Sequence, residues 1–443
     1  METPIYDFLR GYAESGTLRA HMPGHKGVSP EGKLAELYRL DITEIKGADS
    51  LFEADGIIAR SEANATQLYR TASTVYSAGG STLCIQAMLA LMKQEKRRII
   101  AVRNVHRAFL NAAALLGLDV QWILPEYSDG ILSGRILLPD VEAALAVSSE
   151  PACVYVTSPD YTGRLADIAS LSALCHRYGA KLLVDNAHGA HLAFFEKSLH
   201  PIALGADLCC DSAHKMLPAL TGAAMLHTSC KEYVPKLKQA MSIFGSTSPS
   251  YLIIASLDLC NRYLSEKIRS DIAAALPRIA NLRESFSDRL IFTESEQFHI
   301  TIKAAESGYS GTELAEFLRD NGVEYEYADE ELIVLLMSPF SSDEDYGRLR
   351  ASLEIAVSKA LRYEIRKPAF QMNLPKVACG IREAVFASSE EVSVEEAEGR
   401  VCASVKVPCP PAVPIAVSGE IIDRQCIEIF QAYGIKKVLV MKN

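Results

Sequence analysis

The 443-residue sequence has no long apolar run. Its N-terminal stretch, METPIYDFLRGYAESGTLRAHMPGHKG, carries charges throughout and contains no apolar core of the kind found in signal peptides. No window approaches the ~18 consecutive apolar residues that a membrane-spanning helix needs. We therefore expect a cytoplasmic protein without a membrane partner.

The sequence also lacks an excess of positive charge. It has 45 Lys and Arg residues against 55 Asp and Glu residues, and its net charge is -10. No run of Lys and Arg forms a basic tail. Because a nucleic-acid-binding surface is basic, these features argue against nucleic acid as a partner.

The cysteine pattern lacks the signatures of disulfides and metal sites. The eleven cysteines are an odd number, they are scattered, and no C-x-x-C pair occurs. We expect reduced and mostly buried thiols. His21 and His25 have the spacing of metal ligands on a helix, but Pro23 and Gly24 between them would break that helix. We therefore predict no metal site.

The middle of the chain has the pattern of an α/β fold. Short apolar runs alternate with amphipathic helical ones, which predicts a mainly parallel sheet with helices on both faces. The run at 222–228 follows the run at 206–211 without room for a full helix between them, so this last strand can be antiparallel. The predicted strands are 97–102, 119–124, 152–157, 180–185, 206–211 and 222–228.

The chain is long enough for several domains. Beyond residue 270, a smaller α+β pattern includes a helix opened by Ser310, with Glu313 as a possible capping box, and a helix over 343–363. Near the C-terminus, VKVPCPPAVPIAVSGE (405–420) predicts a rigid loop, because proline excludes regular helix and central strand. The predicted parts are an N-terminal arm (1–55), a large domain (56–270), a small α+β domain (271–364) and a C-terminal α+β domain (365–443).

Polar residues follow the predicted strands at the edge where open α/β sheets bind ligands. Gly79, Gly80, Ser81 and Thr82 open a helix, and such a helix start can hold a phosphate, although it is also an ordinary N-cap. Other strand ends carry three further groups: an amine, a carboxylate, and a ring that could stack on a ligand. These further residues are His106, Asp185, His188, Ser212, His214 and Lys215.

Each of these residues separately has a structural explanation. Together they match the requirements of pyridoxal 5′-phosphate (PLP), which needs a lysine for a Schiff base, an acidic partner for its ring nitrogen and a phosphate cradle. The ordered set is much more specific than its members.

The sequence resembles the bacterial ornithine/lysine/arginine decarboxylases, in their short form without an N-terminal wing domain. The resemblance runs from HMPGHKG (21–27) and DITEIKGADSL (41–51) through DNAHGAH (185–191) and SAHKMLPALTG (212–222) to PCPPAVPIAVSGE (408–420). It implies the PLP-dependent fold of aspartate aminotransferase (fold type I) and a homodimer, with active sites at the interface and the possibility of a higher oligomer.

The resemblance also implies a role for each matching residue. Lys215 would bond to the cofactor, Asp185 would pair with the pyridine nitrogen, and His106 would stack on the ring. His188 would lie beside the phenolic oxygen of PLP or the substrate carboxylate. The phosphate would be surrounded by Gly80, Ser81, Thr82, Ser212 and His214. The STSPSY loop (246–251), with Ser246 and Thr247, would reach into the partner's site.

Three positions depart from the family pattern. Asn186 stands where an acidic residue is usual, and Cys84 stands where glycine is usual. In PDYTG (159–163), Asp160 and Thr162 flank the retained Tyr161. We expect this last loop to lie near the substrate.

The expected reaction is α-decarboxylation of lysine, arginine or ornithine, and the sequence does not choose among these substrates. The acidic stretch 324–331 could meet the distal cation of the substrate, or it could be a solvated turn. Two alternatives to the reaction remain open. One is another PLP chemistry, such as transamination, since the fold does not determine the reaction. The other is a drifted paralogue that keeps the cofactor without the activity.

Overall fold

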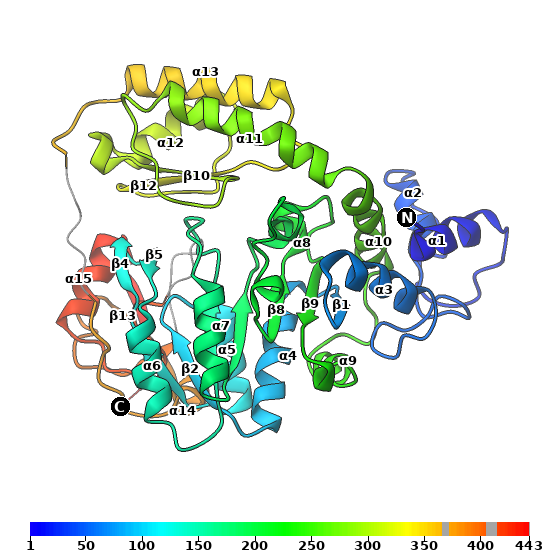
Figure 1. Ribbon diagram of the computed structural model, residues 1–443, viewed down its shortest axis with the longest axis horizontal. Coiled ribbons are helices and arrows are strands. Elements are labelled where there is room, and N and C mark those ends of the chain that lie inside the picture. The colour runs from blue at the N-terminus through cyan, green and yellow to red at the C-terminus, as the bar shows by residue number, and fades with distance from the viewer. Residues whose placement is uncertain (366–371, 405–413, 443) are drawn as a thin grey trace. The chain divides into compact units, whose positions relative to one another are not determined.

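The computed structural model describes residues 1–365, 372–404 and 414–442 (Figure 1). The chain forms two compact units, each built from segments that are distant in the sequence. The first unit contains residues 1–95 and 181–270, and the second contains 96–180 and 271–443. Among the described residues, no helix combines the length and apolar character needed to cross a bilayer. The four-part division expected from the sequence remains a prediction.

The first unit contains strands in the order β1-β9-β8-β7. Strands β7 and β8 are parallel, whereas β9 is antiparallel to both β8 and β1. The expected antiparallel run at 222–228 is therefore confirmed. Strand β1 was not predicted, because its sequence STVYS contains too few apolar residues to resemble a buried strand. The bounds are Ser73–Ser77 (β1), Lys181–Asp185 (β7), Leu208–Asp211 (β8) and Ala224–Thr228 (β9).

Helices cover these strands. Helix α4 packs against β9, α3 packs against β1, and α1 packs against α3 and α10 (Figure 1). The Asp258 carboxylate on α10 accepts from the backbone N–H groups of Ile5 (2.9 Å) and Tyr6 (3.0 Å), which fastens the start of α1. The helices are α1 (Pro4–Glu14), α2 (Ala35–Leu40), α3 (Ile57–Tyr69), α4 (Gly80–Gln94), α8 (Ala213–Met216), α9 (Leu237–Ser242), α10 (Tyr251–Glu266) and the 3-10 turns η1 (Ala190–Phe194), η2 (Pro201–Leu204) and η3 (Lys231–Tyr233).

The second unit contains three parallel strands in the order β6-β2-β3. The sequence predicted all three strands, and its helical patterns match α5, between β2 and β3, and α7, which follows β6. The fold class is confirmed, since parallel strands alternate with helices along the chain. The elements are β2 (Arg98–Val102), α5 (Arg107–Leu116), β3 (Val120–Ile123), the hairpin β4 (Glu126–Asp129) and β5 (Ser133–Arg135), α6 (Leu138–Ala146), β6 (Ala152–Thr157) and α7 (Ile168–Arg177).

A small antiparallel sheet follows, with the order β10-β12-β11. Ser310 caps α12 as predicted, but the Glu313 carboxylate accepts from the Leu361 N–H (3.2 Å) instead of completing a capping box. A complete capping box opens α13, between Ser342 and Asp345. The bounds are α11 (Ile268–Ser285), β10 (His299–Lys303), the 3-10 turn η4 (Ala305–Ser307), α12 (Gly311–Asp320), β11 (Tyr327–Ala328), β12 (Leu332–Leu336) and α13 (Asp343–Lys359).

The C-terminal segment has its own sheet, with the order β13-β15-β14. Its helix α14 packs on α5, where the Arg382 guanidinium donates to the Leu115 carbonyl at the helix end (2.6 Å). Residues 405–413 of the proline-rich stretch lie outside the described residues, and 414–420 are buried. The elements are α14 (Ile381–Phe386), β13 (Ser389–Ser393), β14 (Cys402–Ser404), α15 (Arg424–Ala432) and β15 (Lys437–Met441).

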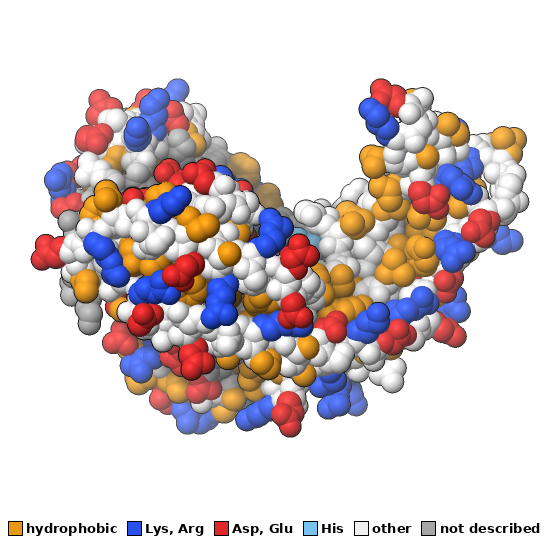
Figure 2. All heavy atoms as spheres, turned by 90° about the horizontal axis from the view of Figure 1, so that it is seen from above, with side chains coloured by type: hydrophobic (Ala, Val, Ile, Leu, Met, Phe, Trp, Pro, Cys, Tyr) orange, Lys and Arg blue, Asp and Glu red, His pale blue; other side chains and the backbone are white. Residues whose placement is uncertain are grey.

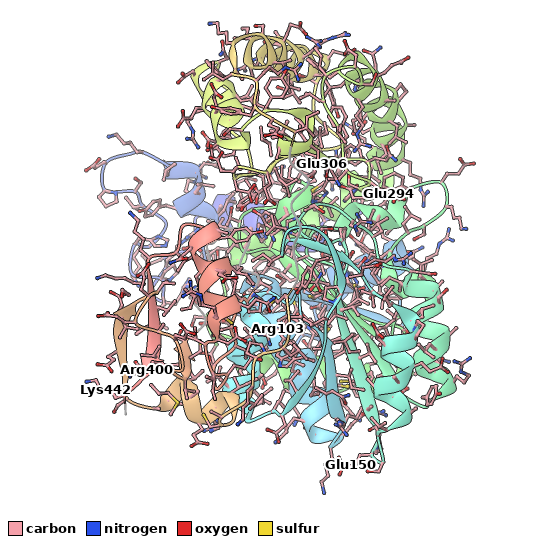
Figure 3. The ribbon with its side chains drawn as sticks, turned by 90° about the vertical axis from the view of Figure 1, so that its left-hand side faces the viewer. Arg103, Glu150, Glu294, Glu306, Arg400 and Lys442 are labelled. Atoms are coloured by element: carbon pink, nitrogen blue, oxygen red, sulfur yellow. The ribbon has the colours of Figure 1, made fainter. Side chains whose placement is uncertain are left out.

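A buried ion pair fastens this segment within the second unit. Arg103, just after β2, lies in the interior (Figure 3), and its two terminal nitrogens donate to the Glu420 carboxylate at 2.9 and 2.6 Å. The same guanidinium donates to the Ile415 carbonyl (3.3 Å) and lies over the Trp122 ring. Such a planar two-bond contact is specific to arginine, so lysine could not replace Arg103.

Candidate functional site

Lys215 lies in a four-residue helix that directly follows β8. Its Nζ atom lies 2.9 Å from Nε2 of His188, which the chain brings from the end of β7. Lys215 is exposed and His188 is 6 % exposed. The structure therefore places an accessible amine beside a ring nitrogen that can exchange a proton with it.

Asp185 is the last residue of β7, and its carboxylate is 2 % exposed. Its Oδ1 accepts from the Ala187 N–H (3.1 Å) and lies 3.6 Å from Sγ of Cys210. Since β7 and β8 are parallel, Asp185 and Lys215 come from the same edge of the sheet.

The start of α4 has the features of a phosphate cradle. Its N-cap is Gly79, no side chain caps the helix, and the first N–H groups of a helix have no intrahelical partner. Gly80 has φ +67°, and a Cβ built there would meet no atom within 4 Å, so space is open in front of this turn. Ser212, which directly follows β8, donates to Ser81 (2.9 Å), so the end of this strand is joined to the start of α4.

The remaining predicted residues of the first unit are distributed as follows. His214 lies 2.9 Å from the Ala223 carbonyl through Nδ1, and Thr82 is exposed in the first turn of α4. Ser246 and Thr247 are exposed in the loop before α10, where the Ser246 hydroxyl accepts from the Ser248 N–H (3.1 Å).

His106 belongs to the second unit. It is the N-cap of α5, and its Nδ1 accepts from the Ala108 N–H at 3.1 Å. The ring is exposed. Its predicted role as a stacking residue remains a prediction.

The residues at the two departures Cys84 and Asn186 are both fully buried. Cys84 is fully buried in α4, near the Gly80 carbonyl, and burial raises the pKa of its thiol. The Asn186 amide donates to the carboxylate of Asp211 (2.7 Å). A carboxylate is thus adjacent to this position, on the neighbouring strand.

The loop at 159–163 uses its unusual residues internally. Oδ1 of Asp160 accepts from the N–H and hydroxyl of Thr162 and from the Arg164 N–H, at 2.8 to 3.0 Å, and Oδ2 accepts from Ser133 (2.7 Å). Because these bonds occupy both carboxylate oxygens, Asp160 holds the loop together rather than offering an acidic group to a ligand.

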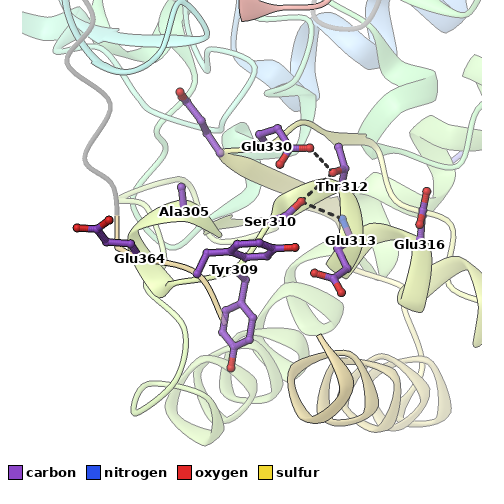
Figure 4. A pocket seen from close by; sticks show the side chains of 10 residues that line it. Ala305, Tyr309, Ser310, Thr312, Glu313, Glu316, Glu330 and Glu364 are labelled. Carbon is purple, nitrogen blue, oxygen red and sulfur yellow. Dashed lines mark hydrogen bonds between the residues drawn. The ribbon is translucent and has the colours of Figure 1, made fainter. Parts of the chain in front are cut away.

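The acidic stretch 324–331 divides between a solvated turn and a pocket. Glu324 is exposed and pairs with Arg319 (2.9 Å), which is the solvated alternative. Glu330 and Glu331 instead line a cavity of about 840 Å³ with Glu313 and Tyr309 (Figure 4). The Glu330 carboxylate accepts from Thr312. A role in substrate recognition stays a prediction for this stretch.

The residues of the first unit fit PLP by their chemistry. An open, uncapped helix start suits a phosphate, a buried carboxylate suits a protonated ring nitrogen, and an accessible amine suits the aldehyde carbon. The helix start is accessible from the side of Gly80, where a built Cβ meets no atom within 4 Å.

Comparisons with known proteins agree with these features. The family described as "Orn/Lys/Arg decarboxylase, major domain" matches residues 3–305, and "Orn/Lys/Arg decarboxylase, C-terminal domain" matches 363–435. Two Bacillus subtilis proteins, the uncharacterized protein YaaO and an arginine decarboxylase, are each 28% identical to this chain. The alignments cover 97% and 96% of this chain, and 93% and 92% of those proteins.

A solved structure has the same fold. The crystal structure of the Francisella novicida lysine decarboxylase LdcF covers 99% of this chain with a TM-score of 0.82, at 16% identity and 81% coverage of its own chain. The family match extends over more than half of the sequence, and it includes the segments that carry Lys215 and Asp185. The chain therefore belongs to the ornithine/lysine/arginine decarboxylase family and is a decarboxylase.

Proposed function

We propose that this protein uses PLP to remove the α-carboxyl group of a basic amino acid, releasing carbon dioxide and the corresponding amine. The observation that carries the proposal is the contact between Lys215 and His188, 2.9 Å apart at the strand edge that also bears Asp185. Arginine is the first substrate to test, because a relative of nearly full-length coverage is named an arginine decarboxylase.

The cofactor would be held by residues from both strand ends and from α4. Asp185 would keep the ring nitrogen protonated, because a buried carboxylate stabilises a neighbouring cation. When bound, PLP accepts the electron pair that the departing carboxyl group leaves at Cα. The phosphate would be surrounded by Gly80, Ser81, Thr82, Ser212 and His214, while His106 would stack on the ring and Ser246 and Thr247 would serve the partner's site.

The chain's own part in the reaction is orientation and proton transfer. The amine of Lys215 can pass a proton to Nε2 of His188 or take one from it, since the two atoms are within hydrogen-bond distance. One of the two would deliver a proton to Cα after carbon dioxide has left. The remaining protein must hold the Cα–carboxyl bond perpendicular to the ring and exclude water.

The test is a product assay by mass spectrometry. PLP-loaded protein is offered arginine, lysine and ornithine separately, and agmatine, cadaverine or putrescine is measured. We expect amine from one substrate, and a loss on the order of 10³-fold or more in Lys215→Ala. Lys231→Ala, which removes an exposed lysine of the same unit, is the matched control.

Each outcome distinguishes among the candidate functions. Borohydride reduction followed by peptide mapping should locate the cofactor on Lys215. A keto acid in place of an amine would favour transamination. A protein that binds PLP on Lys215 but produces nothing from any of the three amino acids would instead be a drifted paralogue.

We also propose a cytoplasmic homodimer. Figure 2 shows apolar side chains gathered on the part of the surface formed by the N-terminal segment. Leu18, Met22, Val28 and Leu34 are between 64% and 87% exposed there. A partner subunit would cover such side chains, which are unusual on the surface of a monomer. The ten cysteines among the described residues are all free thiols, as expected in a reducing compartment.

A further inference from the structure

Asp211, the last residue of β8, is fully buried and is surrounded by hydrogen-bond donors. Its Oδ1 accepts from Nδ2 of Asn186 (2.7 Å) and lies 3.7 Å from Sγ of Cys209. Its Oδ2 lies 3.1 Å from Nε2 of His200 and 3.2 Å from Nε2 of His227. Asp211, Asn186, His200 and His227 are called the Asp211 cluster below.

Nε2 of His200 makes a hydrogen bond to the carboxylate, whereas Nε2 of His227 lies near the same oxygen without hydrogen-bond geometry. Nδ1 of His200 accepts from the Ile202 N–H (3.4 Å), so Nε2 is the ring nitrogen that carries a hydrogen. Nδ1 of His227 lies 2.9 Å from the Thr74 hydroxyl, which can donate to it. Because Nε2 of His200 carries a hydrogen, that atom cannot also bind a metal ion. The cluster is a hydrogen-bond network.

The carboxylate of Asp211 is ionised in this network. Burial raises its pKa, but the neighbouring His200 and His227 lower it by more, so the pKa lies well below the usual range of an aspartate. Burial lowers the pKa of His227, which is therefore neutral near pH 7. The Asp211 carboxylate is thus a buried negative charge, and Asn186 and His200 donate to its two oxygens.

The Asp211 cluster is joined to the lysine site through Asn186. The Asn186 N–H donates to the Cys210 carbonyl (3.0 Å), and its own carbonyl accepts from the Gly189 N–H (2.8 Å), which closes the turn that carries His188. A Cβ added at Gly189 would collide with Oδ1 of Asn186. The Asn186 side chain therefore packs directly against the turn that carries His188.

We propose that Asp211 is a positioning residue for the reaction: by holding the Asn186 amide, it fixes the 186–189 turn and so keeps His188 against Lys215. This inference rests on the proposed function, since it assigns the origin of the geometry at Lys215. Asp211 is fully buried and would act through the Asn186 amide.

The donor pattern makes a specific prediction for Asp211→Asn. All the neighbours of this side chain are donors, and a carboxylate is an acceptor at both oxygens. An asparagine would place its own NH₂ group against either the Asn186 amide or the two histidines. The exchange Asn186→Asp with Asp211→Asn removes this conflict. In the exchange variant, the amide oxygen of the asparagine at position 211 can face the histidines, while its NH₂ group donates to the carboxylate at position 186.

The experiment measures kcat, KM and the PLP dissociation constant of four variants. These are Asp211→Asn, Asn186→Ala, the exchange Asn186→Asp/Asp211→Asn, and the control Asp258→Asn. In both single variants of the cluster we expect kcat to fall about 10- to 100-fold, with KM changed less than about threefold. The kcat of the exchange variant should be at least about tenfold higher than the kcat of Asp211→Asn.

The control separates positioning from folding. Asp258 is another fully buried carboxylate of the first unit, and it accepts from backbone groups far along the chain from Lys215. Its variant should lose stability but keep kcat within about twofold. Asn186→Ala keeps the buried carboxylate with its histidines, so it remains informative if Asp211→Asn does not fold.

Two results would overturn the proposal. One is a folded Asn186→Ala or Asp211→Asn that keeps the kcat and PLP affinity of the wild type. The other is an exchange variant that is folded and no better than Asp211→Asn. A wild-type protein that forms no amine would instead contradict the proposed function, which the variants do not test.

Discussion

Buried charged residues in the first unit are surrounded by groups that compensate their burial. Glu62 is an example: Lys238 lies 2.7 Å from one carboxylate oxygen, and the Tyr76 N–H donates to the other at 3.0 Å. Burial nevertheless raises the pKa of Glu62 to about 7. The carboxyl is therefore less easily ionised in the folded protein than in the unfolded chain.

This raised pKa predicts a pH dependence of stability. As the pH rises from about 4.5 to about 7, the unfolded chain releases the Glu62 proton while the folded protein keeps it. The contribution of this group to the free energy of unfolding is present at low pH and decreases by roughly 3 kcal/mol over that window. Urea unfolding of the wild type and Glu62→Gln at several pH values checks this.

The difference in the free energy of unfolding between Glu62→Gln and the wild type should therefore change in sign or size between the two ends of the pH window. The glutamine keeps the bond from the Tyr76 N–H and cannot titrate. Parallel stability curves for the two proteins would contradict the prediction.

Single residues of the site differ in how far the sequence could predict them. Lys215, Asp185 and His188 stand at or within four residues of the ends of apolar strands, where polar residues are visible in the sequence. Asp211, His200 and His227 were not predicted as a group. Their meeting depends on the pairing of β8 with β9 and on the position of η2, which no local pattern encodes.

At the scale of elements, the loop between β6 and α7 is held by contacts that leave no room for a side chain at Gly163. Its φ is +91°, and a Cβ built there would lie inside contact distance of the His299 side chain. The Thr301 hydroxyl donates to the Thr162 carbonyl (2.8 Å), so the loop is tied to β10. Both the backbone conformation and the space require glycine.

Gly163→Ala should therefore destabilise the second unit by more than the backbone strain alone. Gly399→Ala is the matched control, because Gly399 also has a positive φ (+79°) but nothing lies within 4 Å of its added Cβ. We expect the free energy of unfolding to fall by about 1–2 kcal/mol in the control, and by at least about 2 kcal/mol more in Gly163→Ala. The measurement is the free energy of unfolding in urea, and equal losses would refute the argument.

Most elements could be predicted from periodicity, whereas some of their ends could not. The helix expected over 343–363 ends at Lys359, since Ala360 is already extended and Tyr363 donates to the Gly308 carbonyl. The segment 323–328 forms a strand only at Tyr327–Ala328, where it pairs with β12. In both places a tertiary contact, rather than local preference, sets the boundary.

At the scale of the whole molecule, the exposed apolar side chains of the N-terminal segment argue for a second subunit. We expect a mass in solution of about 97 kDa, twice the 48.4 kDa of the chain, by light scattering after size-exclusion chromatography. Met22→Glu with Leu18→Glu should lower this mass or weaken the dimer, because burying a carboxylate without a partner is costly. A wild-type protein that is monomeric and fully active would contradict the dimer.

The sequence by itself determined the class of the fold, the positions of the main strands and the residues that mark the family. Apolar periodicity and the chemistry of strand ends are local properties that a linear pattern contains. The tertiary structure decided the partners of those residues. Lys215 with His188, Ser212 with Ser81, Arg103 with Glu420, and Asp211 with its donors all join distant segments. Such contacts depend on strand pairing and burial, and these exist only after the chain has folded.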